Sequence, residues 1–219
     1  HIDFAPEKFH VMHWRNGVVA GVPARVFRIS FSGEVSYEIN VESGYGRHVW
    51  DAVMAAGQPH DIAAYGTETM HVLRAEKGFI IAGQDTDGSL TPLDLGMGWA
   101  MAMKKDYPFL GKRSLSRSDT AREGRKQLVG LLTEDPTTVL EEGAQIVADP
   151  KQPLPMRMIG HVTSSYWSEA LGRSIAMALV EGGQELQGTT LHVPMESRTI
   201  GAKVTGVTFY EPDRQRLKV

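Results

Sequence analysis

Apolar and polar residues alternate along two stretches near the start of the chain, residues 25–31 and residues 35–41. A period of two residues is typical of half-buried strands. The apolar side of the first stretch consists of Phe27, Ile29 and Phe31. Ser32-Gly33-Glu34 separates the two stretches, and a short connection containing glycine is typical of a hairpin. Gly21 and Pro23 indicate one more short strand and a turn before this pair.

The period then becomes that of a helix. A stripe with i, i+3, i+4, i+7 spacing comprises Val49, Ala52, Val53 and Ala56, and Gly57 follows at an expected helix end. A second helix is predicted over residues 67–77, with Gly78 as its stop. Its shared face consists of Met70, Leu73 and Lys77. The order strand, strand, helix, helix favours an α+β fold over a doubly wound parallel sheet.

The second half of the chain shows a different pattern. Residues 114–126 are polar and charged, which predicts a linker. Short apolar runs separated by glycine, proline, aspartate and serine then follow at residues 128–132, 145–148, 159–163, 175–180, 190–193 and 200–207. Regular short strands of this kind predict a small barrel or a sandwich. We therefore expect a mixed α+β domain over residues 1–115 and an all-β domain over residues 116–219.

Composition narrows the class of protein. The 219 residues include 23 basic and 26 acidic side chains and no cysteine. This balance argues against a strongly basic nucleic-acid binder, and the missing cysteine excludes disulfides, thiolate metal sites and cysteine nucleophiles. No apolar run approaches the length of a membrane span, and no signal-peptide pattern is present at the start. We expect a cytoplasmic protein without nucleic-acid or membrane partners.

General catalytic motifs are missing from the sequence, which has no phosphate loop, no dinucleotide fingerprint and no nucleophile elbow. His10 and His13 could share a metal on a helix, but their neighbours favour a strand that places them on opposite faces, as two ordinary histidines. Residues 85–88 begin like a calcium loop. The twelfth position is then Gly96 rather than a glutamate, so an aspartate-rich turn is the better interpretation.

Glu34 is the most interesting candidate, because a carboxylate on a tight turn can accept two parallel hydrogen bonds from a flat donor edge. The ordinary alternative is a solvated carboxylate, which most turn carboxylates are. Trp99 could provide a stacking surface for a planar ligand, or it could be a half-buried core aromatic. Arg74 and Glu76 are expected on a solvated helix face.

The order of several motifs resembles the aminomethyltransferase family, the T-protein of the glycine cleavage system. Residues 25–39 resemble its Thr-Gly-Glu-x-Gly-Tyr-Glu-Ile stretch. Further similar runs are residues 65–78, 83–88, 91–99, 109–112, 160–164 and 171–176. Within the family, the runs at 65–84, 126–135 and 161–167 are similar to the C-terminal region of the sarcosine oxidase α-subunit branch. The resemblance therefore extends over nearly the whole chain.

This resemblance implies a function. In the sarcosine oxidase branch, sarcosine is oxidised on flavin, and the one-carbon unit passes to tetrahydrofolate in this region to give 5,10-methylenetetrahydrofolate. By resemblance, Glu34 is the pterin-binding carboxylate, and Phe31, Tyr37 and Trp99 are the other candidate folate-binding residues. FAD, FMN and NAD are expected elsewhere in a bacterial heterotetrameric complex, and no metal is expected.

Two departures from the family accompany the resemblance. Met70 stands where an arginine of many relatives helps to hold folate. The family's catalytic aspartate is expected before His1, together with an upstream dinucleotide-binding region, so no catalytic residue is assigned. We expect a fragment that packs against the N-terminal part of the α subunit and against the other subunits. An inactive interaction module, and a T-protein-like or dimethylglycine dehydrogenase-like domain, are the alternatives.

Overall fold

The computed structural model describes residues 2–218 and divides into two compact units. One unit consists of His1–Arg74 with Glu211–Val219, and the other is Ala75–Tyr210. The sequence predicts a boundary between two domains near residue 115. The two compact units divide the chain at other positions, and the predicted domain boundary remains a prediction.

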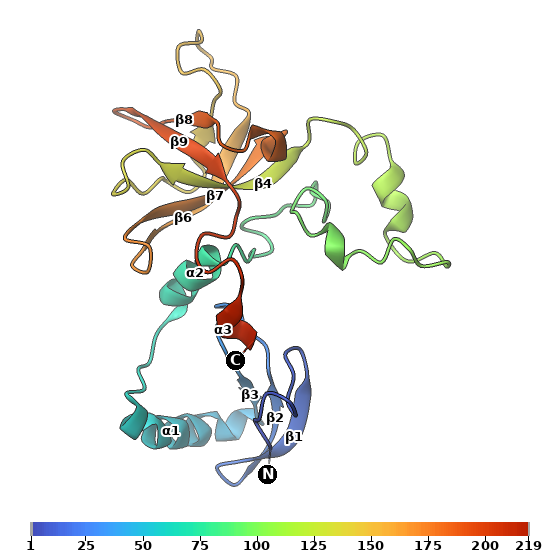
Figure 1. The fold of residues 1–219 in the computed structure, drawn as a ribbon, viewed down its shortest axis with the longest axis vertical. Coiled ribbons are helices and arrows are strands. Elements are labelled where there is room, and N and C mark those ends of the chain that lie inside the picture. The colour runs from blue at the N-terminus through green and yellow to red at the C-terminus, as the bar shows by residue number, and fades with distance from the viewer. Residues whose placement is uncertain (1, 219) are drawn as a thin grey trace. The chain divides into compact units, whose positions relative to one another are not determined.

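The first unit contains a three-stranded antiparallel sheet in the order β1 (Trp14–Val19), β2 (Val22–Phe27) and β3 (Glu38–Asn40). One long helix, α1 (Gly46–Gly57), follows the sheet (Figure 1). Its remaining elements are short: η1 (Ser43–Tyr45), η2 (Gln58–His60) and α3 (Gln215–Lys218). Helix α2 (Thr67–Glu76) crosses the division between the units.

The predicted hairpin is correct in its partners and wrong in its turn. Arg25 pairs with Asn40 and Phe27 pairs with Glu38, so the two predicted stretches are antiparallel neighbours. A tight hairpin instead joins β1 to β2, and residues 28–37 form a long loop before β3. Gly33 has a φ of 77°, and its N–H donates to Ser30 Oγ at 2.9 Å within this loop. Glu34 therefore lies on a loop rather than on a two-strand turn.

The aromatic residues Phe27 and Phe31 predict that their side of the 25–31 stretch is buried, but the opposite side of β2 is the buried one. Its buried positions are Val22, Ala24, Val26 and, just beyond the strand, Arg28. Phe27 and Ile29 are only half-buried, and Phe31 is exposed. Arg28 is tolerated inside because its Nη1 donates to the Phe9 carbonyl at 2.7 Å.

Both predicted helices are present. In α1 only Val49 is buried. Gly57 has a φ of −81° rather than a left-handed conformation, and its missing side chain leaves room for Ile62, which an added Cβ would approach to 2.6 Å. At the end of α2, Gly78 does adopt a positive φ of 70°, as a helix-stop glycine should.

The second unit is a six-stranded antiparallel sheet with strand order β5-β6-β7-β4-β9-β8. The strands are β4 (Lys126–Thr133), β5 (Gln145–Ile146), β6 (Gly160–Ser168), β7 (Arg173–Glu181), β8 (Thr190–Pro194) and β9 (Thr199–Thr205). Short 3-10 turns lie at η3 (Gly98–Ala100), η4 (Lys112–Ser116) and η5 (Gly183–Leu186). Val147 and His192 exchange backbone hydrogen bonds of 2.9 and 3.0 Å, which joins the two edge strands. The sheet is therefore a nearly closed barrel, and the predicted α+β fold with a C-terminal barrel is confirmed.

The barrel has an apolar interior and a covered outer face. Interior side chains come from alternate positions of its strands, among them Val129, Leu131, Val162, Ala178 and Val204. On the outside, Met177 and Leu179 of β7 and Leu128 of β4 pack against Ile80, Leu90, Leu95, Val207 and Phe209. Strand β7 is thus buried on both faces, which explains its unbroken apolar run at residues 175–180. The segment after α2 is part of the barrel's packing.

Candidate functional site

Glu34 lies on the 28–37 loop with its side chain 37% exposed. Its Oε1 is 3.6 Å from Nη1 of Arg216, which belongs to the same unit. A guanidinium is a flat donor group, so Arg216 presents to Glu34 the same kind of donor edge that a pterin ring has. The Glu34 carboxylate is accessible, and it can accept hydrogen bonds from the kind of flat donor edge that the predicted pterin ligand has.

Two candidate aromatic residues flank this part of the loop, but in different surroundings. Phe31 is exposed. Tyr37 lies in an aromatic cluster, edge-on to Phe4 at 4.9 Å between ring centroids and 5.8 Å from the ring of the fully buried Phe9. Tyr37 is therefore fixed by packing, whereas Phe31 is accessible to a ligand.

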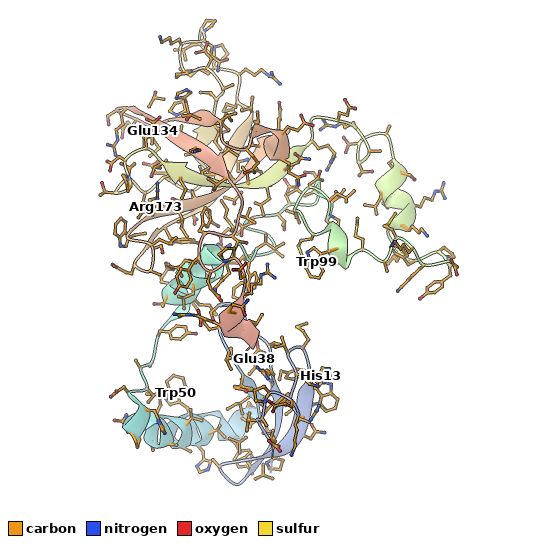
Figure 2. The ribbon with its side chains drawn as sticks, in the orientation of Figure 1. His13, Glu38, Trp50, Trp99, Glu134 and Arg173 are labelled. Carbon is orange, nitrogen blue, oxygen red and sulfur yellow. The ribbon has the colours of Figure 1, made fainter. Side chains whose placement is uncertain are left out.

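Trp99 is 80% exposed, in η3 of the second unit (Figure 2). The interpretation of Trp99 as a half-buried core aromatic is therefore wrong. Its role as a stacking surface remains a prediction. Trp99 and Glu34 belong to different units.

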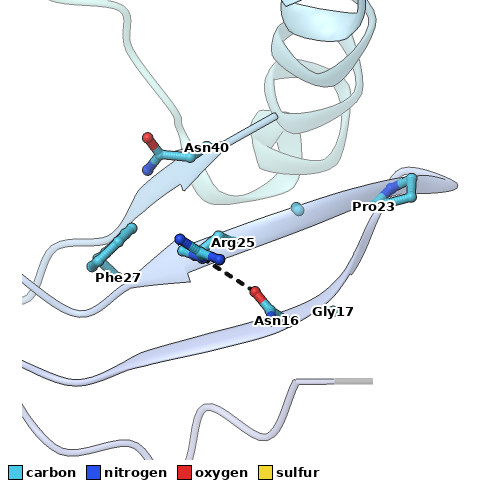
Figure 3. A pocket seen from close by; sticks show the side chains of 7 residues that line it. Asn16, Gly17, Pro23, Arg25, Phe27 and Asn40 are labelled. Carbon is cyan, nitrogen blue, oxygen red and sulfur yellow. Dashed lines mark hydrogen bonds between the residues drawn. The ribbon is translucent and has the colours of Figure 1, made fainter. Parts of the chain in front are cut away.

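A shallow pocket of about 410 Å³ lies on the sheet of the first unit (Figure 3). Its polar lining comes from Asn16, Arg25 and Asn40, with Phe27 beside them. Arg25 Nε donates to Asn16 Oδ1 at 3.3 Å, and the guanidinium stacks over the Trp14 ring at 4.7 Å. The arrangement offers donors to a polar or anionic group. No motif marks these residues in the sequence, because they meet only through strand pairing.

The charged residues at the end of α2 are buried, so the predicted solvated helix face is wrong. The side chains of Arg74, Glu76 and Lys77 are all shielded from solvent. Glu76 Oε1 accepts a hydrogen bond from Ser168 Oγ at 2.6 Å, and Lys77 Nζ lies 5.0 Å from the centre of the Tyr210 ring. These partners lie about 90 and 130 residues further along the chain, which periodicity cannot reveal.

Asp85 is another buried charged residue, which the sequence predicted only as part of an aspartate-rich turn. Its Oδ1 accepts hydrogen bonds from Thr163 Oγ1 at 2.6 Å and Ser164 Oγ at 2.7 Å, and its Oδ2 accepts from the Ile81 N–H. The aspartate-rich turn is confirmed at Asp87, which is exposed and accepts from Ser89. Asp85 instead attaches its loop to strand β6.

Arg125 and Asp94 form a buried ion pair at the end of the predicted linker. Arg125 donates through Nε and Nη2 to the Asp94 carboxylate at 2.8–3.1 Å, and both side chains are less than a tenth exposed. Asp94 also accepts from the N–H and hydroxyl of Thr91. Arg125 Nη1 donates to the Asp119 carbonyl at 3.0 Å. This part of the linker is therefore anchored rather than solvated.

The ion pair predicts a pH dependence of stability. Burial raises the pKa of the Asp94 carboxyl, but hydrogen bonds from Arg125 and Thr91 outweigh it and hold the pKa below the ordinary 3.8. Such a group stabilises the fold above its unfolded pKa, and the stabilisation is lost as the pH falls through the native pKa. We expect the stability difference between wild type and Asp94→Asn to shrink below about pH 3.8, measured by urea unfolding at a series of pH values. A difference that stays constant down to about pH 2 would contradict this assignment.

The two early histidines lie together rather than on opposite faces, so that prediction is wrong. A turn at Met12 brings the His10 and His13 rings to 5.5 Å, edge to face. Within residues 2–218, no three histidine, aspartate or glutamate side chains gather as a metal site would require. In the same part of the chain, every helix is too short or too polar to cross a bilayer.

Comparison with known protein families gives two matches in chain order. The GCVT N-terminal domain matches residues 1–105, and the glycine cleavage T-protein C-terminal barrel domain matches residues 126–211. Together the two matched ranges cover most of the chain, and the second contains every strand of the barrel.

Comparison with individual proteins gives the same picture. The chain is 46% identical to sarcosine oxidase subunit alpha of Corynebacterium sp. (strain P-1), over 98% of this chain and 22% of that protein. It is 34% identical to an aminomethyltransferase of Streptomyces avermitilis, over 79% of this chain and 45% of that protein. The aminomethyltransferase structure from Bartonella henselae covers 86% of this chain and 50% of its own, with a TM-score of 0.73 at 22% identity, which supports the fold. The chain spans about a fifth of the length of its sarcosine oxidase relatives.

Proposed function

Since the chain belongs to the glycine cleavage T-protein family, we propose that it is the folate-binding part of a sarcosine oxidase α subunit. In this proposal the one-carbon unit of oxidised sarcosine passes to tetrahydrofolate, the acceptor substrate, to give 5,10-methylenetetrahydrofolate. The similarity to sarcosine oxidase subunit alpha over 98% of the chain is the observation that carries it. FAD, FMN and NAD belong elsewhere in the complete complex, with the other subunits and the preceding part of the α subunit.

Glu34 is the residue that we propose to hold the pterin ring. Its accessible carboxylate can accept two parallel hydrogen bonds from the amino and ring N–H edge, while the exposed Phe31 ring offers an apolar surface nearby in the sequence. Tyr37 supports the loop from the aromatic cluster, and Trp99 is proposed as a further binding residue. The chemical contribution of this chain is then mainly proximity, because the bound acceptor only has to meet an incoming imine in a suitable orientation.

Replacement of Glu34 tests the folate assignment. Glu34→Gln keeps the shape but removes the charge-assisted acceptor, so reduced-folate binding should weaken by about 1–3 kcal/mol, or roughly 5- to 150-fold. Titration calorimetry of the chain with tetrahydrofolate measures this effect. Arg216→Ala should strengthen binding, because it removes the cation 3.6 Å from the carboxylate.

Glu38→Gln is the matched control for Glu34→Gln, since Glu38 is an exposed carboxylate on the following strand (Figure 2). Its affinity for tetrahydrofolate should equal that of the wild type. If Glu34→Gln binds tetrahydrofolate as tightly as Glu38→Gln, Glu34 does not hold the pterin ring.

An interaction module without folate binding is the second candidate, and one observation favours it. The first unit buries few apolar side chains, namely Phe9, Val22, Ala24, Val26 and Val49, and it exposes a larger set, namely Phe4, Met12, Trp14, Val18, Phe31, Val35, Ile39, Tyr45, Trp50, Val53 and Tyr65. Exposed apolar surface of this kind is typical of a face that packs against other protein. A folded chain that binds no tetrahydrofolate in the calorimetric titration would favour this candidate.

A further inference from the structure

Residues 97–117, the 97–117 segment, concentrate positive charge in a protein whose overall charge is −3. The segment contains five basic residues and one acidic residue: Lys104, Lys105, Lys112, Arg113, Arg117 and Asp106. Within residues 2–218, none of the five cations forms a salt bridge. Lys105 and Lys112 lie over the rings of Tyr107 and Phe109 at 5.4 and 5.6 Å, contacts that leave their charge in place. The segment therefore presents positive charge that no carboxylate of the described residues neutralises.

The same segment exposes large apolar side chains. Trp99, Met103, Tyr107 and Leu110 are all exposed, and Leu110 is as accessible as in an extended peptide, at 103%. No side chain of the segment belongs to either apolar cluster of the barrel. Figure 1 shows the segment in green, extending away from the barrel of its own unit. Grouped exposure of this kind on a soluble chain is typical of an interaction surface.

A hollow of about 430 Å³ is lined by both apolar residues and a charged residue of this segment. Its apolar lining includes Leu90, Pro92, Met101, Phe109, Leu110 and Leu115, and Arg117, an exposed residue, also lines it. The volume is sufficient for one or two apolar side chains. An arginine among the residues that line an apolar pocket favours an occupant whose apolar group is adjacent to a carboxylate.

We propose that the 97–117 segment is a docking surface for an acidic polypeptide segment that inserts an apolar anchor residue into this hollow. Complementary charge would orient the partner, and the anchor would supply apolar burial at the centre of the contact. A polypeptide fits better than a nucleic acid, because Phe109 is the one aromatic residue among those that line the hollow, whereas bases bind on stacked aromatic rings. The proposal does not depend on Glu34 or on folate.

Fluorescence polarisation of the full 219-residue chain with short synthetic peptides tests this surface. The probe is a labelled peptide in which glutamates flank a central leucine, compared with versions that carry serine for leucine or lysines for the glutamates. We expect the glutamate–leucine peptide to bind most tightly, and we expect Lys104→Glu/Arg113→Glu to weaken it about tenfold or more. Leu110→Ser should remove the advantage of leucine over serine without unfolding the chain, because Leu110 is exposed.

Lys151→Glu/Lys203→Glu is the matched charge-reversal control, since both lysines are exposed and lie outside the segment. It should bind the peptide as the wild type does. Equal binding of the lysine peptide, equal weakening by the control, or tighter binding of a single-stranded DNA oligonucleotide than of the acidic peptide would each overturn the proposal. Because none of these measurements contains folate, their failure is distinguishable from failure of the proposed function.

Discussion

Arg125→Met is expected to lower the free energy of unfolding by about 3–5 kcal/mol, the cost of leaving a buried charge without its partner. Arg125 is the donor for Asp94 through two nitrogens, and it also binds the carbonyls of Ser89 and Asp119. Methionine retains much of the side-chain volume but donates no hydrogen bond. The variant would therefore leave the Asp94 carboxylate inside the protein with only the hydrogen bonds from Thr91.

Urea unfolding followed by tryptophan fluorescence measures the loss, and Arg122→Met is the matched control. Arg122 also pairs with a carboxylate, Asp119 at 3.0 Å, but both side chains are more than half exposed. An exposed pair contributes about 0–1 kcal/mol, so the control should change stability little. If Arg125→Met is as mild as Arg122→Met, the ion pair does not anchor the end of the 114–126 stretch.

The double variant Arg125→Met/Asp94→Leu distinguishes the cost of an uncompensated buried charge from the cost of the lost hydrogen bonds. Replacing both members of a buried pair by apolar groups removes the uncompensated charge, so part of the lost stability should return. Recovery should remain incomplete, because the Thr91 N–H and hydroxyl lose their acceptor. A double variant no more stable than Arg125→Met would indicate that loss of the Asp94 acceptor outweighs removal of the uncompensated charge.

The barrel could be predicted closely from the sequence, because each of its strands has a local signal. The six apolar runs between residues 128 and 207 coincide with β4 to β9, separated by turn residues. Local signals of this kind depend on neighbouring residues alone. The sheet closes through the pairing of Val147 with His192, which are far apart in the sequence. Periodicity does not report such a pairing, so the sequence was compatible with either a barrel or a sandwich.

The first unit was predicted less well, for a physical reason that Arg28 illustrates. Alternation assigned the aromatic side of residues 25–31 to the interior, but Arg28 is buried on the other side because the Phe9 carbonyl accepts its hydrogen bond. In the second unit, Glu76 is buried for a similar reason, through Ser168. Buried charges are stabilised by partners distant in sequence, and no local pattern contains those partners.

The candidate site depended on resemblance more than on pattern. Residue chemistry alone favoured a solvated carboxylate at Glu34 over a ligand-binding one, and only the family resemblance reversed that preference. The structure adds that the carboxylate is accessible and has a guanidinium at 3.6 Å. The Glu34→Gln titration is therefore the functional test of this assignment. The sequence did not predict that Asp85 and Asp94 are buried. The structure shows that both carboxylates are buried and that their hydrogen bonds hold segments of the second unit together.

Gly130→Ala in β4 is expected to lower the free energy of unfolding by about 3 kcal/mol, at the upper end of the usual cost of overpacking. An added Cβ would lie 2.3 Å from the Gly206 carbonyl oxygen and 2.8 Å from Thr205 Oγ1. The first of these atoms belongs to the backbone, so β4 and the end of β9 would have to separate to admit it. Thermal or urea unfolding measures the loss, and we expect the variant to keep the barrel fold with a lower midpoint.

Gly88→Ala is the matched control for this strand glycine, because no atom lies within 4 Å of its added Cβ and its φ is not left-handed. Alanine there restricts the unfolded chain without a clash, so stability should stay within about 0.5 kcal/mol or rise slightly. The contrast between two identical chemical changes isolates the close approach of the backbones at Gly130. If both variants have the same midpoint, β4 is not packed as closely against residue 206 as the described barrel requires.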